Sequence, residues 1–316
     1  MGFYVFLAAR RKPGWLALIP QGGEITLAHV VRRRDSRPEV CLLDRFVVEA
    51  SEREALKRLR SARSLKSCTC TTLMAEGEYS LTQIDAPQVP QEERKEALRW
   101  AIKEMVAYPV DSACIDVLDI PSAGMPQGRS AGVMVVSAAE SAVRSRVAPF
   151  EAAKVPLAAV DIPELAQRNV AALLEDENRG LAFLRVDESG MMLTLTFHGE
   201  LIAVRRGEMN TRQLNSADAG ERARVMERLV LEVQRSLDNF DRQYSHIPIS
   251  KVVLACYPLV ENLMNELIES IYVPVREMDL ASVLDFPSIP ELRNPQAQAK
   301  SLLAIGAALR TDGVAL

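Results

Sequence analysis

The sequence predicts an α/β fold with two lobes, because two groups of closely spaced strands are each followed by amphipathic helices. The first group is separated by Pro- and Gly-containing turns, a pattern typical of β-hairpins: Phe3–Ala9, Trp15–Pro20 and Glu24–Val31. The second group repeats this style further along the chain: Leu181–Val186, Met191–Phe197 and Leu201–Arg205. We therefore expect a hairpin-rich sheet at the start of each lobe.

Strands and helices alternate after the first hairpins. A helix is expected over Ser51–Ala62, because Ser51 is a favourable N-cap and two glutamates follow in the first turn. This helix lies between predicted strands at Arg45–Ala50 and Cys68–Met74. The order of strands and helix continues the α/β pattern.

A linker rich in Pro and Gln, Asp85–Pro90, leads into a small inserted unit. A helix is predicted over Glu92–Ala107, because apolar residues recur at positions i, i+3, i+4 and i+7: Leu98, Ala101, Ile102 and Met105. Two strands, joined by a loop over Pro121–Arg129, and a second helix complete the unit: Ala113–Ile120, Ala131–Ala138 and Ser141–Ala153.

The remainder of the chain provides the helices and strands that complete the two lobes. Predicted strands are Pro156–Asp161, Lys251–Cys256 and Tyr272–Arg276. Predicted helices are Pro163–Leu174, Glu221–Asp241, Val260–Ser270 and a final amphipathic segment around Leu302–Leu309. The apolar stripe along Glu221–Asp241 is interpreted as a face that packs into the core.

Composition restricts the class of protein. The 316 residues are 48% apolar and 25% charged, with a formal net charge of −4. These values favour a globular protein with a substantial core and give no general attraction to nucleic acid. The longest apolar stretches are far shorter than the roughly 20 residues that cross a bilayer. We expect a cytoplasmic protein without an anchor of its own.

The sequence contains a few weak candidates for catalytic, metal-binding or anion-binding sites. Cys68-Thr-Cys70 could form a metal pair, but no second Cys or His pair follows, and five cysteines do not indicate a disulfide framework. The run Gly128–Gly132 matches G-x-S-x-G, but a predicted strand, not a helix, follows the serine, so a turn is expected. The basic runs Arg10–Lys12 and Arg32–Arg34 could attract phosphates or an anionic membrane, or form solvated strand ends. Three histidines, His29, His198 and His246, are expected to be surface or strand-edge residues.

Several segments together resemble the PilM-type pilus assembly proteins, and they occur in family order over nearly the whole chain. In the inserted unit the match runs from Glu96–Ala101 through Met105–Val110 to Ile115–Leu118. The segments that follow resemble the family's later strands and helices: Ala158–Ile162, Leu165–Arg168, Leu231–Asp238, Tyr272–Val275 and Ser301–Arg310.

The resemblance implies an actin-like (ASKHA) two-lobed fold with an inserted small α+β subdomain of the PilM/FtsA type. The implied domains are residues 1–85 for first-lobe subdomain 1A, completed by 154–178 and 295–316. Residues 86–153 would form the inserted subdomain 1C, and residues 179–294 the second lobe (2A/2B).

The resemblance also implies a nucleotide cleft between the lobes, but this sequence departs from the family there. Actin-like ATPases hold Mg²⁺ and phosphates with D-x-G turns in two hairpins. We assign the first turn to Ala8–Gly14, which has no acid, and the second to Asp187–Gly190, where only Asp187 and Gly190 remain as cofactor-binding candidates. Ala255–Pro258 replaces the adenosine-side glycines. We expect a pseudo-ATPase without a cofactor; the alternative is an ATP-switched ATPase in which Asp187 still positions Mg²⁺.

Finally, the resemblance implies a scaffold beneath the inner membrane. It would bind the cytoplasmic N-terminal peptide of a bitopic, PilN-like membrane protein, with a platform ATPase and further copies of the chain as additional candidate partners. Four residues of the inserted unit are expected to line the peptide groove: Trp100, Met105, Tyr108 and Pro109. For Trp100 and Met105 the alternative is core packing of the helix. A peptide adaptor of another secretion system remains a third interpretation.

Overall fold

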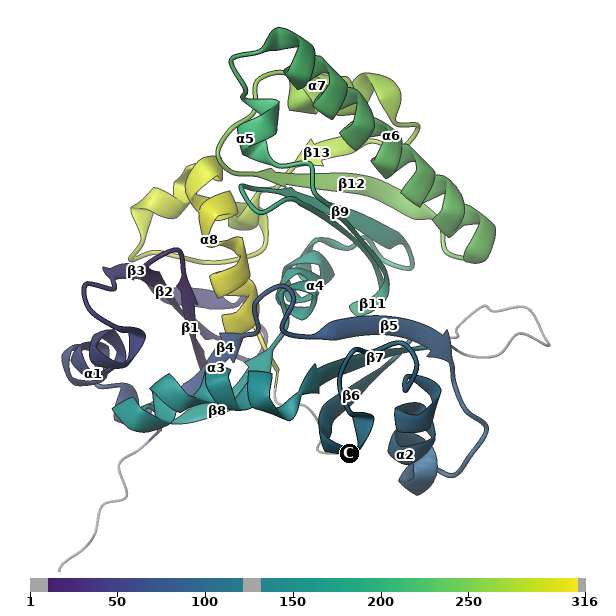
Figure 1. Ribbon diagram of the computed structural model, residues 1–316. Helices are drawn as coiled ribbons and strands as arrows, with labels where there is room; N and C mark the ends of the chain where they lie inside the picture. Colours follow the sequence, from purple (N-terminus) through teal and green to yellow (C-terminus); the bar gives the residue numbers. More distant parts are fainter. Residues whose placement is uncertain (1–10, 122–131, 312–316) are drawn as a thin grey trace, which may run out of the picture.

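The computed structural model describes residues 11–121 and 132–311 (Figure 1). Two five-stranded sheets have the same strand order and the same directions: β3-β2-β1-β4-β8 and β11-β10-β9-β12-β13. In each sheet the first three strands of the chain form an antiparallel meander, and the next two pair in parallel. This repeated topology makes the turns β1–β2 and β9–β10 structurally equivalent.

The strands of the first sheet are β1 (Trp15–Gln21), β2 (Glu24–Val31), β3 (Glu39–Val47), β4 (Thr69–Leu73) and β8 (Leu157–Asp161). Those of the second are β9 (Gly180–Val186), β10 (Met191–Phe197), β11 (Glu200–Gly207), β12 (Ile249–Cys256) and β13 (Val275–Glu277). Most of the predicted strands from Trp15 onward are thereby confirmed, with small shifts at their ends. Two predictions agree only in part, because Arg45–Ala50 overlaps only the end of β3 and Tyr272–Arg276 overlaps only the start of β13. The predicted strand Phe3–Ala9 lies outside the described residues.

Helices pack on both faces of each sheet (Figure 1). The outer face of the first sheet contacts α1 (Glu52–Ala62) and α3 (Glu140–Ala153). Between the sheets lie α4 (Pro163–Leu174) and α8 (Pro295–Ala308). The far face of the second sheet is covered by α6 (Ala219–Gln243) and α7 (Leu263–Ser270), with the short α5 (Thr211–Leu214) beside them.

Strand β1 illustrates why the layers form. Its residues alternate between two cores, as side chains on a strand must. Leu16 and Leu18 pack toward α1 and α3, whereas Ala17 and Ile19 pack toward the central helices. Both faces of the strand are therefore buried, which explains its continuous apolar sequence. Short 3₁₀ helices complete the connections at Leu65–Ser67, Val110–Ser112, Leu280–Ser282 and Pro290–Arg293.

The inserted unit is a three-stranded antiparallel sheet, in the order β5-β7-β6, covered on one face by α2 (Gln91–Ala101). Its strands are β5 (Ser80–Asp85), β6 (Ala113–Asp119) and β7 (Gly132–Ala139). Strand β5 was not predicted from the sequence, because Leu81 and Ile84 are three residues apart and pack into different cores. Since β5 belongs to this sheet, the expected boundary between 1–85 and 86–153 is wrong, and the unit begins near Ser80.

Helix α2 is shorter than the predicted Glu92–Ala107, since it ends at Ala101 and Ile102 is its C-cap. Only Leu98 and Ile102 of the predicted apolar stripe are buried. The Arg99 guanidinium donates hydrogen bonds to the carbonyls of Val110 and Ala113, at 3.0 Å for Ala113, which holds the returning chain against the helix. None of the helices described is both long and apolar enough to span a membrane.

Candidate functional site

A cavity of about 310 Å³ lies between the two equivalent turns, β1–β2 and β9–β10. The first sheet contributes the turn residues Gln21 and Gly22, and the second contributes Arg185 and Asp187. Lys300 of α8 and Tyr257 after β12 also line the cavity. Its other polar lining residues are Glu24, Thr26, Arg45, Glu188 and Ser189. The cavity is thus located at the carboxyl ends of β1, β9 and β12, where ligands bind in open α/β sheets.

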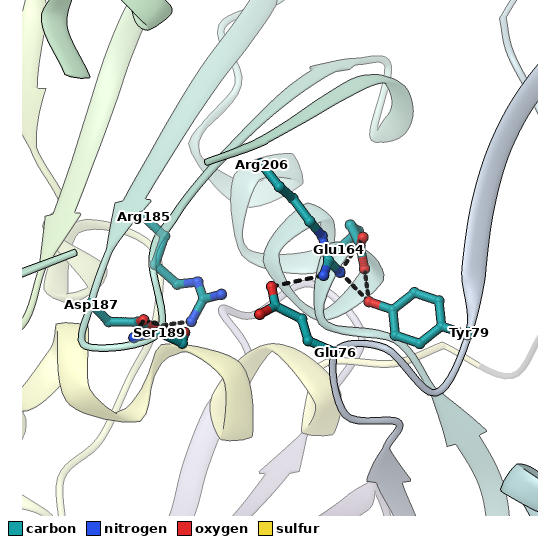
Figure 2. A network of polar contacts seen from close by, with 7 residues as sticks. All are labelled: Glu76, Tyr79, Glu164, Arg185, Asp187, Ser189 and Arg206. Carbon is teal, nitrogen blue, oxygen red and sulfur yellow. Dashed lines mark hydrogen bonds and ion pairs between the residues drawn. The ribbon is translucent and has the colours of Figure 1, made fainter. Parts of the chain in front are cut away.

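The β9–β10 turn carries an internal ion pair. Arg185 Nη1 bonds to Asp187 Oδ2, and the other carboxylate oxygen accepts hydrogen bonds from the amide of Ser189, at 2.8 Å, and from its hydroxyl (Figure 2). The Arg185 side chain is only 10% exposed. Both oxygens of the Asp187 carboxylate are therefore engaged by the turn itself, and the neighbouring Glu188 pairs with Arg212 at 3.0 Å.

Gly190 is required by the hairpin itself. Its φ is +148°, and a Cβ at this position would lie 2.4 Å from the carbonyl oxygen of Gly207 on the adjacent strand. A side chain cannot be accommodated there, because the obstacle is backbone. The glycine predicted as a cofactor-binding residue thus has a structural reason to be present, independent of any ligand.

The first turn is Gln21–Glu24, not Ala8–Gly14 as the sequence analysis expected. Residues 8–10 lie outside the described part of the chain, and Gly14 precedes β1, whose antiparallel partner β2 follows the Gly22-Gly23 turn. The two glycines have φ values of +59° and +80°, and Gln21 pairs with Glu24 across the turn. This is the two-residue hairpin that favours Gly-Gly. The turn itself is visible in the sequence, but its equivalence to Asp187–Gly190 is not.

The end of β12 and the residues after it form a third wall of the cavity. The chain turns through a cis Tyr257–Pro258 peptide bond, and Tyr257 projects its ring toward α8, where Lys300 Nζ lies 5.3 Å from the ring centroid. Gln296 donates a hydrogen bond to the carbonyl of Cys256 at 3.1 Å. The segment Ala255–Pro258 therefore presents side chains at the cavity, as the sequence analysis predicted.

A second polar network joins the lobes beside this cavity (Figure 2). Arg206 of β11 pairs with Glu164 at the start of α4, with Glu76 at 2.7 Å, and with the Tyr79 hydroxyl. Tyr79 in turn donates to Glu164 at 2.6 Å. The Glu164 side chain is only 1% exposed. Burial, together with the Glu164 carboxylate, raises the pKa of Tyr79, so its hydroxyl stays protonated and donates.

None of these four residues was identified from the sequence, because the residues are distant in the chain and match no motif. Arg206 lies near the end of β11, whereas Glu76 and Tyr79 lie between β4 and β5. The only signal was a charged residue, Glu164, in the first turn of a helix, which is ordinary for an N-terminus. Its burial depends on how the lobes pack.

The candidate partner residues lie on the inserted unit and do not line the interlobe cavity. Trp100 and Met105 are each 58% exposed, so the core-packing alternative for them is wrong. Pro109 is also exposed, whereas Tyr108 is half-buried and its hydroxyl bonds to Ser137 at 2.9 Å. Lys103 Nζ lies 4.7 Å from the centroid of the Trp100 ring. An exposed Trp and Met at the end of α2 form an apolar surface feature.

The other sequence candidates lead to no catalytic or metal site. Cys68 and Cys70 are buried in one core, and burial raises the pKa of Cys70 to about 12. Residues 128–131 of the G-x-S-x-G match lie outside the described residues, and Gly132 begins β7. Over residues 11–121 and 132–311, no three His, Cys, Asp or Glu residues come together in a way that could bind a metal.

No family model and no curated protein matches the sequence. Among solved structures, a chain of the PilM–PilN type IV pilus biogenesis complex is similar, with a TM-score of 0.74 and 20% identity, covering 94% of this chain and 98% of that chain. The cytoplasmic domain of EpsL, an inner membrane component of the type II secretion system of Vibrio cholerae, also matches, with a TM-score of 0.49 and 13% identity over 94% of this chain and 95% of that chain. The first of these matches and the repeated sheet topology establish an actin-like fold, as predicted.

Proposed function

We propose that this protein is an actin-like scaffold of a type IV pilus assembly platform, located in the cytoplasm at the inner membrane. Its partner would be a bitopic, PilN-like inner-membrane protein, bound through the cytoplasmic N-terminal peptide. The likeness to a chain of the PilM–PilN complex over 94% of the sequence supports this proposal. Because the nucleotide turns depart from the PilM pattern, we further propose the MSHA type of pilus, with a role like that of MshI.

The exposed aromatic and thioether side chains of the inserted unit support the partner site. Trp100 and Met105 are large, apolar and solvent-facing, and such residues act as anchors when a peptide binds. Lys103 Nζ lies over one face of the Trp100 ring in a cation–π contact, which would orient the ring at the surface. The peptide would thus bind on the α2 side of the inserted unit, away from the interlobe cavity.

The internal ion pair of the β9–β10 turn supports a degenerate nucleotide site. A Mg²⁺ ion bound to phosphates needs a nearby carboxylate whose oxygens are free to accept hydrogen bonds from the ion's water ligands. Asp187 is the carboxylate at the required place, and Arg185 and Ser189 already occupy its oxygens. The residues present therefore do not fit Mg-ATP, and we propose a pseudo-ATPase that acts by binding only.

A pull-down of the partner's cytoplasmic peptide tests the partner site. We expect the double variant Trp100→Ala with Met105→Ala to lose capture, because truncating two anchors removes several kcal/mol of binding, on the order of 2 kcal/mol each. The matched control is Leu259→Ala with Ile268→Ala, two apolar residues that are 65% and 53% exposed on the second lobe. Equal capture by a folded Trp100/Met105 variant would contradict the proposed groove.

A further inference from the structure

The sheet of the inserted unit has a free strand edge. Its strand order is β5-β7-β6, and no strand of residues 11–121 and 132–311 pairs with the outer side of β6. Such an edge presents backbone N–H and C=O groups that can pair with an added extended chain. We refer to the outer side of β6, over Ala113–Asp119, as the β6 edge.

Hydrogen bonds show which residues of β6 point outward. In an antiparallel ladder, alternate residues direct both backbone groups toward the neighbouring strand, and the residues between them direct both groups away. The Ala113 carbonyl accepts a hydrogen bond from the Arg99 side chain at 3.0 Å, so it does not face β7. The Val117 amide donates to the Asp116 carboxylate at 3.0 Å, so it does not face β7 either.

Ile115 lies midway between these two outward-facing residues and therefore has the same orientation. Within the described residues, no turn, loop or side-chain group bonds to its backbone. Its N–H and C=O are thus available at the centre of the β6 edge. Its side chain packs beneath α2, so the position of the strand is fixed.

Helix α2 lies over β6 and runs in the opposite direction (Figure 1). Arg94, near the start of the helix, pairs with Asp119 at the end of the strand. Arg99, near the end of the helix, bonds to Ala113 at the start of the strand. The exposed Trp100 follows Arg99 directly. A chain along the β6 edge would therefore pass the end of α2 that carries the proposed anchor.

The charges beside the β6 edge are unbalanced. The neighbouring cations Arg94, Arg99 and Arg144 each pair with a carboxylate. Asp111 and Asp116 are exposed and, within the described residues, have no cationic partner. Across residues 80–121 and 132–139, acidic side chains also outnumber basic ones. Electrostatic complementarity therefore favours a cationic chain at this edge.

The same charges disfavour a second copy of the protein as the occupant. Two β6 edges paired with each other would bring their carboxylates together, and like charges across a strand pair are destabilising. Cytoplasmic segments close to a membrane span are enriched in Lys and Arg. The cytoplasmic peptide of the proposed partner is therefore the occupant whose charge matches.

We propose that the partner's cytoplasmic peptide binds as an added strand along the β6 edge, with basic side chains beside Asp111 and Asp116. This inference rests on the proposed function for the identity of the partner, and it adds the binding mode and the charge of the peptide. Backbone bonds to Ile115 supply affinity for any extended chain, and the two carboxylates supply the preference for a basic one.

Fluorescence anisotropy with two labelled probes tests the proposal on the full-length protein. The probes are the partner's cytoplasmic peptide and a short alternating valine–lysine peptide. We expect both to bind, more weakly as salt increases, and an alternating valine–glutamate peptide not to bind. Ile115→Pro removes the outward N–H and leaves the ladder with β7 intact, since proline is tolerated at such edge positions. Both probes should then bind about tenfold more weakly, as expected for the loss of two hydrogen bonds.

The matched control is Asp85→Pro, on the opposite edge of the same sheet. Asp85 pairs with Gly132, whose carbonyl accepts from Ile120 at 3.1 Å on the β6 side, so the Asp85 amide points outward from β5. This variant carries the same kind of change at an edge that the proposal leaves free. Binding of both probes should remain within about twofold of wild type.

A second pair of variants tests the charge preference. Asp111→Asn with Asp116→Asn should weaken binding of both probes about fivefold, because two exposed ion pairs are lost. The control, Glu266→Gln with Glu269→Gln, removes two exposed carboxylates from α7 of the second lobe and should leave binding unchanged.

Methylating the backbone nitrogens of the partner's peptide tests the strand pairing without changing the protein. Alternate residues are methylated in two separate peptides, one for each phase of the strand. Only the phase whose N–H groups face β6 should lose affinity. Thermal unfolding of each protein variant establishes that a loss of binding is not a loss of folding.

The two proposals fail in different ways. If the partner's peptide binds, but Ile115→Pro binds it as well as Asp85→Pro does and methylation acts equally in both phases, the added strand is wrong and the proposed function survives. If only the valine–lysine peptide binds, and does so through Ile115, the proposed partner is wrong and the basic strand site is supported. If neither probe binds, or if the wild type self-associates through Ile115 instead, the inference is overturned.

Discussion

The turns β1–β2 and β9–β10 occupy equivalent places in two sheets of the same topology, yet their chemistry differs. The first is an open Gly22-Gly23 turn whose glycines would meet nothing within 4 Å if they carried a Cβ. The second is closed by its own Arg185–Asp187 pair and by a glycine that contacts backbone. The shared topology thus conserves the position of a turn but leaves its side chains free to change.

Beside these turns, ion pairs join the two lobes directly. Arg206 of the second lobe pairs with Glu164 and Glu76 of the first. The lobes are thus linked by the chain's own charged side chains.

The largest expected effect is that of breaking this interlobe network. Arg206→Met leaves the buried Glu164 carboxylate without its cation, so the free energy of unfolding should fall by about 4 kcal/mol. Denaturant unfolding measures the change. The matched control is Arg212→Met, which removes the exposed partner of Glu188 and should cost less than about 1 kcal/mol.

A double variant sharpens this prediction. Adding Glu164→Gln to Arg206→Met removes the unpaired charge and should recover part of the lost stability, because the penalty comes from the buried carboxylate. No recovery, or equal costs for Arg206→Met and Arg212→Met, would mean that the network does not link the lobes.

The second-largest expected effect comes from replacing a glycine in each of the two turns. Gly190→Ala should lower the free energy of unfolding by about 3 kcal/mol, because the new Cβ meets the Gly207 carbonyl and the backbone is strained. Gly22→Ala should cost only about 1 kcal/mol, because its φ of +59° is unfavourable but the space is open. Urea unfolding of both variants measures the two losses in free energy of unfolding and shows which is larger. A larger cost at Gly22 would contradict the comparison.

Local patterns in the sequence predicted most elements of this fold. Helix α4 was predicted at Pro163–Leu174 and strand β10 at Met191–Phe197, and both have these bounds. Ser51 caps α1 as expected, accepting from the amide of Glu54 at 3.3 Å. These features depend on residues that are close in the sequence, so a short stretch of sequence is enough to predict them.

Features that depend on distant residues were not predicted. Helix α2 ends at Ala101, where Arg99 holds the returning chain through its carbonyls, and β5 is a strand because β7 pairs with it. The first turn of the cavity was assigned to the wrong hairpin, since only the pairing of β1 with β4 shows which strands are equivalent. Arg185 was not identified as a site residue, because a single arginine within an apolar strand matches no motif. Its role becomes apparent only from its ion pair with Asp187 in the structure.

The smallest expected effect concerns pH. Burial, and secondarily the charge of Lys12, lowers the pKa of His29 despite its bond to the Pro13 carbonyl. Because the folded pKa lies below the unfolded value of about 6.5, the unfolded chain binds the proton more readily. Stability should therefore fall as the pH decreases through about 6.5, and the fall should be smaller in His29→Gln. Thermal unfolding at a series of pH values measures both. Parallel curves for the two proteins would show that His29 does not contribute.

Calorimetric titration with Mg-ATP tests the central claim most directly, with a competent actin-like ATPase as the positive control. We predict no heat of binding and no thermal stabilisation for the wild type, because its own cation already occupies the Asp187 carboxylate. A ligand at about a hundred times its dissociation constant would add about 2.7 kcal/mol to the free energy of unfolding. Saturable binding with a stabilisation of this size, abolished by Asp187→Ala, would contradict the account.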